Sequence, residues 1–215
     1  MGIESINIFD IAIILLVILL SMTLHEVMHG YVAYLLGDDT AKLQGRLTLN
    51  PIKHIDPFLT IILPVLLAVS GAPIFGGAKP VPFNPARVKY DEWGSALVAL
   101  AGPVTNFLIA FTLFGLWAAL GAEYNSVLGG VLWQAVLINL GFFIFNMIPF
   151  PPLDGSRVLY ALAPEFVRRG MEAIEQYGVV FVFVIVLFAS SAIGAFMLSA
   201  MKLFITIFSA IFGIA

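Results

Sequence analysis

Four long and nearly uninterrupted apolar runs constrain this chain more than any other feature of its sequence. They cover residues 6–36, 94–121, 127–149 and 177–213. About 20 apolar residues are enough for a helix to cross the roughly 30 Å hydrocarbon core of a bilayer. Because lipid offers no water to backbone groups, a single spanning segment of this kind must be helical. We therefore expect an all-α polytopic membrane protein, with residues 1–215 forming one domain built as a helical bundle.

Three further segments are less regular. Residues 57–72 are apolar but contain Pro64 and are too short to span, so we expect a short or re-entrant segment. Residues 42–49 alternate leucine or glycine with polar residues, which predicts a small β-strand among the loops. The run 177–213 is too long for one simple span. It suits either one span plus a surface helix or two short spans that turn near Ser190.

The charges indicate an orientation. Nearly all lysines and arginines lie in 37–93 and 150–176, which places both segments on the cytoplasmic face. The run 57–72 must then enter and leave on that same side. A formal net charge of −3 argues against a nucleic-acid partner. The chain has no cysteine, so any metal must be held by histidine and carboxylate groups.

The first apolar run contains a metal-binding pattern. His25-Glu26-Val27-Met28-His29 is H-E-x-x-H, and on a helix residues four apart lie on one face. Two imidazoles so placed can bind Zn²⁺, with Glu26 beside the open position as general base. Charged groups within a membrane helix cost roughly 2.5–3.5 kcal/mol each on insertion scales, so they usually have a partner or a function. A chance pentapeptide, or polar residues at a helix contact, is the weaker interpretation.

A catalytic zinc needs a third protein ligand, and Asp154 is the best candidate. It follows the third full span in a proline-rich stretch, where irregular backbone at membrane depth is tolerated only around a cavity or inside protein. With one full span between them, the first and third spans run the same way, so Asp154 reaches the same membrane face as His25. The alternative is a simple turn, because Asp-Gly is a common turn pair.

Five motifs now make a family resemblance clear. They are His25-Glu26-x-x-His29, Gly45 to Pro51 followed by His54-Ile55-Asp56-Pro57, Ala78 to Pro82, Ala101-Gly102-Pro103-x-x-Asn106, and Asn146-x-x-Pro149-x-x-Pro152-Leu153-Asp154-Gly155. In this order they resemble the site-2 protease family, the M50 intramembrane zinc metalloproteases. The resemblance covers most of residues 20–160 and is greatest to compact bacterial or archaeal members without PDZ or CBS domains.

The resemblance implies a three-helix catalytic core with one Zn²⁺ per chain, bound by His25, His29 and Asp154. It implies Glu26 as the catalytic acid and base. It further implies a multi-pass protein of a prokaryotic cell membrane, with its active site nearer the cytoplasmic face. The expected partners are the lipid bilayer and substrates that are single-span membrane proteins or signal-peptide remnants. The sequence leaves the individual substrate and the oligomeric state open.

Other polar residues are candidates for supporting roles. A tetrahedral oxyanion needs neutral donors, and Asn146 and Asn106 lie on membrane helices near the inferred site. An interhelical hydrogen bond is the alternative for each. His54 could support a metal ligand from behind, have a regulatory role by occupying the open zinc position in a resting state, or anchor a loop. The many phenylalanines are expected on lipid-facing surface, outside any site.

Two other functions remain open from the sequence. A membrane metal transporter or sensor could use the same ligands, although transporters distribute ligands along a path. An inactive scaffold could retain the fold, although Glu26 then has no evident duty. One compact ligand set with an adjacent glutamate favours peptide hydrolysis.

Overall fold

The structure is a computed structural model that describes residues 8–70, 76–124 and 126–214. Within these ranges it contains helices and no strand. Four helical segments are long and apolar enough to cross a membrane: Ile11–Leu35, Asp91–Ala119, Val127–Asn146 and Ser191–Phe212. The all-α polytopic membrane fold expected from the apolar runs is confirmed.

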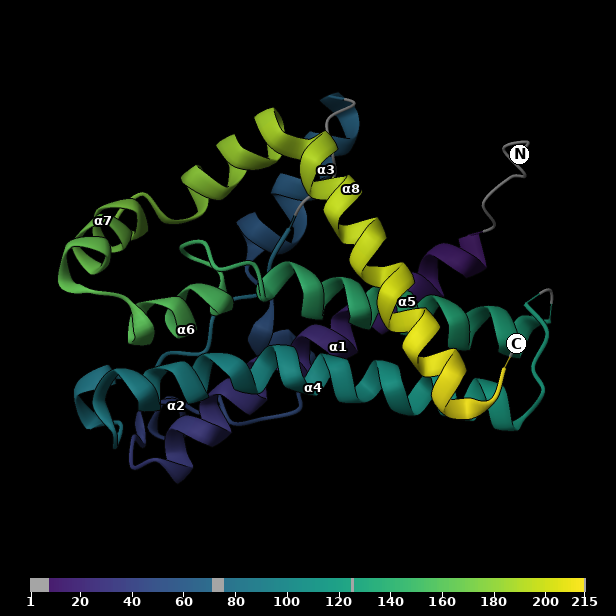
Figure 1. Cartoon of the computed structure of the whole chain (residues 1–215), viewed down its shortest axis with the longest axis horizontal. Helices are drawn as coiled ribbons and strands as arrows, with labels where there is room; N and C mark the ends of the chain where they lie inside the picture. The colour runs from purple at the N-terminus through teal and green to yellow at the C-terminus, as the bar shows by residue number, and fades with distance from the viewer. Residues whose placement is uncertain (1–7, 71–75, 125, 215) are drawn as a thin grey trace.

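The main helices carry the labels of Figure 1. They are α1 (Ile8–Leu35), α2 (Thr40–Leu43), α3 (Leu63–Ser70), α4 (Asp91–Ala119), α5 (Val127–Asn146), α6 (Asp154–Leu162), α7 (Glu165–Glu175) and α8 (Gly178–Phe212). Three short segments join them: 3₁₀ turns η1 (Pro51–His54) and η3 (Pro85–Arg87), and the π-helical η2 (Pro57–Ile62), which leads into α3.

Helices α1, α4 and α5 form the centre of the molecule, with α4 packed against both of the others. Figure 1 shows α4 running antiparallel to α5, while α1 runs the same way as α5. The metal-binding pattern of α1 and the segment that follows α5 therefore meet at one end of the bundle. Helix α8 crosses α5 and α4 obliquely, and its ribbon bends part of the way along (Figure 1).

The strand predicted for residues 42–49 is wrong. Asp38 accepts hydrogen bonds from the amide and the hydroxyl of Thr40 at 3.1 and 2.5 Å, where α2 begins. The amides of Leu43 and Gln44 then donate to carbonyls four residues earlier, as in a helical turn. Gly45 ends the turn with φ +63°, a left-handed conformation that glycine adopts without strain. These local hydrogen bonds therefore override the alternating pattern.

Asp38 also ties the end of α1 to the loop before α4. Its side chain is fully buried, and Oδ2 accepts the amide of Asn84 at 2.6 Å. Burial by itself would raise the pKa of Asp38. The hydrogen bonds from Thr40 and Asn84 and the nearby charge of Arg87 outweigh it and hold this pKa below its ordinary value.

The two irregular apolar runs are also described in part. Pro57–Ser70 consists of η2 and α3, and its apolar helix is shorter than the four spans. The second run forms one helix, α8, of which Ser191–Phe212 has span length and composition.

The phenylalanines were expected on the lipid-facing surface, but several of them are packed inside the protein. Phe114 and Phe208 are almost completely buried, and Phe107, Phe111, Phe143 and Phe204 pack against them. These rings join α4, α5 and α8 through mostly tilted and edge-to-face contacts, with ring centroids 5.1–6.5 Å apart. Because α8 must pack against two helices of fixed spacing, large rings fill the space between them.

Candidate metal centre

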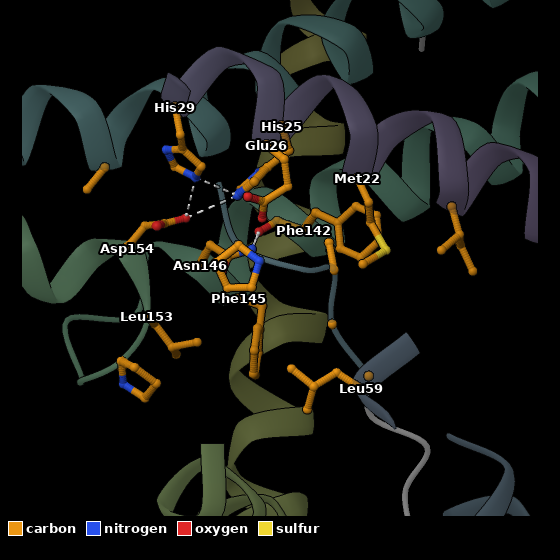
Figure 2. Close-up of a pocket in the computed structure, with 18 of the residues that line it drawn as sticks. Met22, His25, Glu26, His29, Leu59, Phe142, Phe145, Asn146, Leu153 and Asp154 are labelled. Carbon is orange, nitrogen blue, oxygen red and sulfur yellow. Dashed lines mark hydrogen bonds and ion pairs between the residues drawn. The ribbon is translucent and has the colours of Figure 1, made fainter. Parts of the chain in front are cut away.

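Three ligand atoms converge beside α1. Nε2 of His25 lies 3.0 Å from Nε2 of His29, and Oδ2 of Asp154 lies 3.2 and 3.5 Å from these two nitrogens. Figure 2 shows the three side chains pointing toward one another from α1 and from the start of α6. Ligands about 2.0–2.1 Å from a tetrahedral zinc stand roughly 3.3 Å apart, so this spacing matches a zinc site. The structure thus brings together the three ligands that were predicted.

The outer nitrogens of the two histidines fix their protonation. Nδ1–H of His25 donates to Oδ1 of Asn106 at 2.6 Å, and Nδ1–H of His29 donates to the Val98 carbonyl at 2.7 Å. Both partners can only accept, so each neutral ring carries its proton on Nδ1 and a lone pair on Nε2. Two lone pairs 3.0 Å apart repel each other unless they share a cation. The donor set of two imidazoles and one carboxylate fits zinc.

Asn106 supports His25 from behind. Its side chain is fully buried, its carbonyl oxygen accepts from His25, and its amide donates to Oδ1 of Asn139 at 2.9 Å. Asn139 in turn donates to the hydroxyl of Ser21 at 3.0 Å. The amide of Asn106 is therefore committed to α5 and α1. This placement fits a positioning role for Asn106 in place of the predicted role as an oxyanion donor.

Asn106→Ala is expected to weaken zinc binding about 10–100-fold, the usual effect of losing the group that orients a ligating histidine. Asn106→Asp keeps the acceptor for His25 and should retain more of the affinity. Competition with a chelator on purified protein measures both. If Asn106→Ala binds zinc as tightly as the wild type, Asn106 does not position His25 for the metal.

The backbone around Asp154 explains how a residue after α5 returns to α1. The segment from Met147 to Leu153 folds into tight turns, and Asp154 is the first residue of α6. A Cβ on Gly155 would lie 2.4 Å from the carbonyl oxygen of Met147, so only glycine lets α6 start this close to the end of α5. The Asp154 side chain remains 21% exposed and faces the cavity.

Gly102, which is part of the Ala101-Gly102-Pro103 motif, lies directly against the metal site although the sequence did not predict a role for it. A Cβ at this position would lie 2.4 Å from Nε2 of His29 and 2.5 Å from Nε2 of His25. The backbone of α4 therefore forms a wall directly against the ligand atoms. The only signal in the sequence was a glycine next to a proline inside a membrane span.

A cavity of about 890 Å³ opens beside the ligands, and its lining includes Glu26 and Asn146. Most of the lining is apolar and comes from α1, α5, α8 and the loop before α4. Figure 2 shows Met22, Phe142 and Phe145 around the polar cluster. Oε2 of Glu26 accepts the backbone amide of Val81 at 2.8 Å.

The remaining predicted residues differ in their placement. Asn146 borders the cavity, and its amide donates to the Phe142 carbonyl one turn back at 3.0 Å. His54 is buried outside the cavity lining, and its Nε2–H donates to the Thr48 carbonyl at 2.9 Å. Its own carbonyl accepts the amide of Lys79. Of the roles considered for His54, the loop anchor fits these contacts.

Comparisons with known proteins agree with this geometry. The model of peptidase family M50 matches residues 13–128 and 118–190. "Putative zinc metalloprotease YwhC" of Bacillus subtilis (strain 168) is 42% identical over 211 residues, which is 91% of this chain and 92% of that protein. "Putative zinc metalloprotease Rip2" of Mycolicibacterium smegmatis is 35% identical over 184 residues, covering 81% of this chain and 66% of that protein. "Zinc metalloprotease MJ0392" of Methanocaldococcus jannaschii is 25% identical over 151 residues, which is 70% of this chain and 34% of that protein. No solved structure gives a significant match.

Proposed function

Because the chain belongs to peptidase family M50 and is a zinc metalloprotease of the membrane, we propose that it hydrolyses peptide bonds within or next to the membrane spans of other proteins. The observation that carries this proposal is the place of the site on a helix that is long and apolar enough to span a membrane. His25 and His29 lie within the span-length part of α1, and the adjoining cavity is lined mainly by apolar side chains of α1, α5 and α8. An apolar cavity at such a place suits an apolar peptide segment better than a soluble loop.

The chemistry follows from the residues that border the cavity. His25, His29 and Asp154 would hold the zinc ion, which would supply a Lewis acid for the scissile carbonyl and would lower the pKa of a bound water to about 7. Glu26 takes the proton of the attacking water and passes it to the leaving amine. Asn146 supplies a neutral donor to the oxyanion after its amide turns away from the Phe142 carbonyl. Asn106 holds His25 in the tautomer that leaves Nε2 free.

The substrates we propose are single-span membrane proteins or signal-peptide remnants in a prokaryotic cell membrane. A membrane helix satisfies its own backbone hydrogen bonds, so it must unwind before a carbonyl can reach the site. The segments 37–93 and 150–176 contain nine of the ten lysines and arginines. This supports an active site nearer the cytoplasmic face, because loops rich in lysine and arginine stay on that side.

Glu26→Gln provides the direct test. It removes the base while keeping side-chain size, so cleavage of a panel of membrane-span substrates should fall about 10²–10⁴-fold. Bound zinc and the melting temperature should stay at wild-type values. Glu123→Gln makes the same change at an exposed position on the α4–α5 loop and should cleave like the wild type.

The outcomes separate the competing functions. If Glu26→Gln cleaves the substrates at the wild-type rate, Glu26 is not the general base. Zinc uptake into proteoliposomes by both proteins, with no cleavage by either, would favour a transporter. Zinc binding with neither cleavage nor uptake would favour a scaffold.

A further inference from the structure

The loop before α4 contains an extended segment, Gly77–Phe83, which we call the strap. Lys79 precedes Pro80 and Val81 precedes Pro82, and a residue before proline is held in the extended region. Pro80 and Pro82 also have no N–H to donate. Because successive N–H groups of an extended chain point to opposite sides, Lys79 and Val81 direct their donors to one side of the strap. The local sequence therefore favours a row of backbone hydrogen bonds along one side of the strap.

Three donors on that side, the amides of Gly77, Lys79 and Val81, have acceptors elsewhere in the protein. The amide of Gly77 donates to the Leu59 carbonyl at 3.1 Å, and that of Lys79 donates to the His54 carbonyl at 2.8 Å. The amide of Val81 is the exception, because it donates to a side chain, Oε2 of Glu26, at 2.8 Å. The row of backbone hydrogen bonds made by the strap therefore ends at Glu26, the proposed general base.

Arg46 fixes the strap from the loop that follows α2. Its side chain is buried, with 8% exposed, and Nη2 donates to the Lys79 carbonyl at 2.8 Å. Nε is buried without a hydrogen-bond partner, and no carboxylate pairs with Arg46 in the part of the chain that the structure describes. Burying a cation without a counter-charge is costly, so a fold keeps such a residue where it serves a purpose beyond stability.

Packing keeps the strap against α1. Val81 is buried, and its side chain lies where a Cβ on Gly30 would come within 2.8 Å of it. Gly30 follows the second histidine of the metal-binding pattern directly. At the far end, Asn84 is tied to the buried Asp38. The strap is thus attached on both sides of Val81.

We propose that Arg46 and the strap are a positioning device for the catalytic base. The Arg46 guanidinium holds the Lys79 carbonyl, which sets the height of the strap over α1. The Val81 amide then holds Oε2 of Glu26, which leaves Oε1 for the proton of the attacking water. This inference rests on the peptidase function proposed above, but it assigns a role to residues that are not zinc ligands, and Arg46 itself lies outside the cavity lining.

The first test changes Arg46. Arg46→Gln should lower kcat about 100-fold, since a small displacement of a catalytic group has an effect of that size. KM and the zinc content should stay near wild-type values. Arg46→Lys retains a donor of similar length and should recover part of kcat. Arg169→Gln, at a side chain that is 76% exposed, makes the same change on the surface and is the matched control.

The second test follows the backbone and needs no activity. The strap keeps five exchangeable amides, at residues 77, 78, 79, 81 and 83, so hydrogen exchange resolved to single residues can follow Lys79 and Val81 separately. Both should be protected in the wild type and exchange faster in Arg46→Gln. Glu26→Ala should release the Val81 amide alone, because the acceptor of Lys79 is untouched. Val81→Pro, which deletes the donor, should lose more of kcat than Val81→Ala, which keeps it.

The outcomes distinguish this inference from the proposed function. Loss of zinc or of the folded state in Arg46→Gln and in Val81→Pro would show a purely structural role and overturn the proposal. Wild-type kcat in both variants would also overturn it, while cleavage by the wild type would leave the peptidase function standing. The exchange experiment also stands if the wild type cleaves no membrane-span substrate. If the Val81 amide exchanges at the same rate in Glu26→Ala as in the wild type, the proposed contact between the strap and Glu26 is wrong.

Discussion

Asp154→Ala is expected to leave the purified protein without zinc and without measurable peptidase activity. A catalytic zinc site needs three protein ligands, and the two histidines alone leave the Nε2 pair without its anionic partner. The loss of zinc affinity should exceed the 10–100-fold that follows from removing an outer group such as Asn106. Metal analysis and chelator competition give the affinity, and cleavage of a membrane-span substrate gives the activity.

The controls for Asp154→Ala separate metal loss from unfolding. Chelator-treated wild type is the reference for the metal-free fold, and the variant should have a melting temperature close to it, because the two proteins differ only in the Asp154 carboxylate. Asp39→Ala removes a carboxylate that is 47% exposed and pairs with Arg87 at the surface, so it should keep zinc and activity. Stoichiometric zinc in Asp154→Ala would exclude Asp154 from the ligand set.

Gly102→Ala is expected to disable the site although all three candidate ligands stay in the sequence. The new Cβ would lie within 2.4–2.6 Å of three imidazole atoms, which is closer than real Cβ contacts come. Both histidines are also held from behind, at Nδ1, by Asn106 and Val98, so they cannot retreat without losing those hydrogen bonds. We expect zinc affinity to fall by more than about 100-fold, with activity falling in parallel.

Gly170→Ala is the matched control for Gly102→Ala. Gly170 lies in α7, and a Cβ there meets nothing within 4 Å. This variant should keep zinc and activity and gain about 0.5–1 kcal/mol of stability from the better helix propensity of alanine. Thermal unfolding in detergent, with zinc analysis of the same samples, compares the pair. Normal zinc binding by Gly102→Ala would show that α4 can move away from α1.

Much of the fold could be predicted because its driving forces are local. Long apolar runs give spanning helices wherever lipid is the solvent, and the structure places α1, α4, α5 and α8 within the predicted runs or a few residues of their ends. The first two ligands follow from helical spacing alone. Asp154 needed a further argument about the direction of spans, and Figure 1 shows α1 and α5 running the same way.

The remainder depends on contacts between distant parts of the chain. No local pattern shows that Asn106 would use its oxygen on His25 and its amide on Asn139, since either group of an asparagine can serve many partners. Gly102 is informative only once α4 is known to face the imidazoles. The strand predicted for residues 42–49 is wrong because Asp38, outside the alternating pattern, accepts hydrogen bonds from Thr40 where the helical turn of α2 begins.

The division of the ligands along the chain has a consequence for biosynthesis. His25 and His29 enter the membrane with the first helix, whereas Asp154 is added only after α4 and α5 have been made. A nascent chain that has inserted α1 alone holds two ligands and the base, but it lacks the carboxylate that completes the centre. The three candidate ligands can therefore come together only after α1, α4 and α5 have been made and have packed against one another.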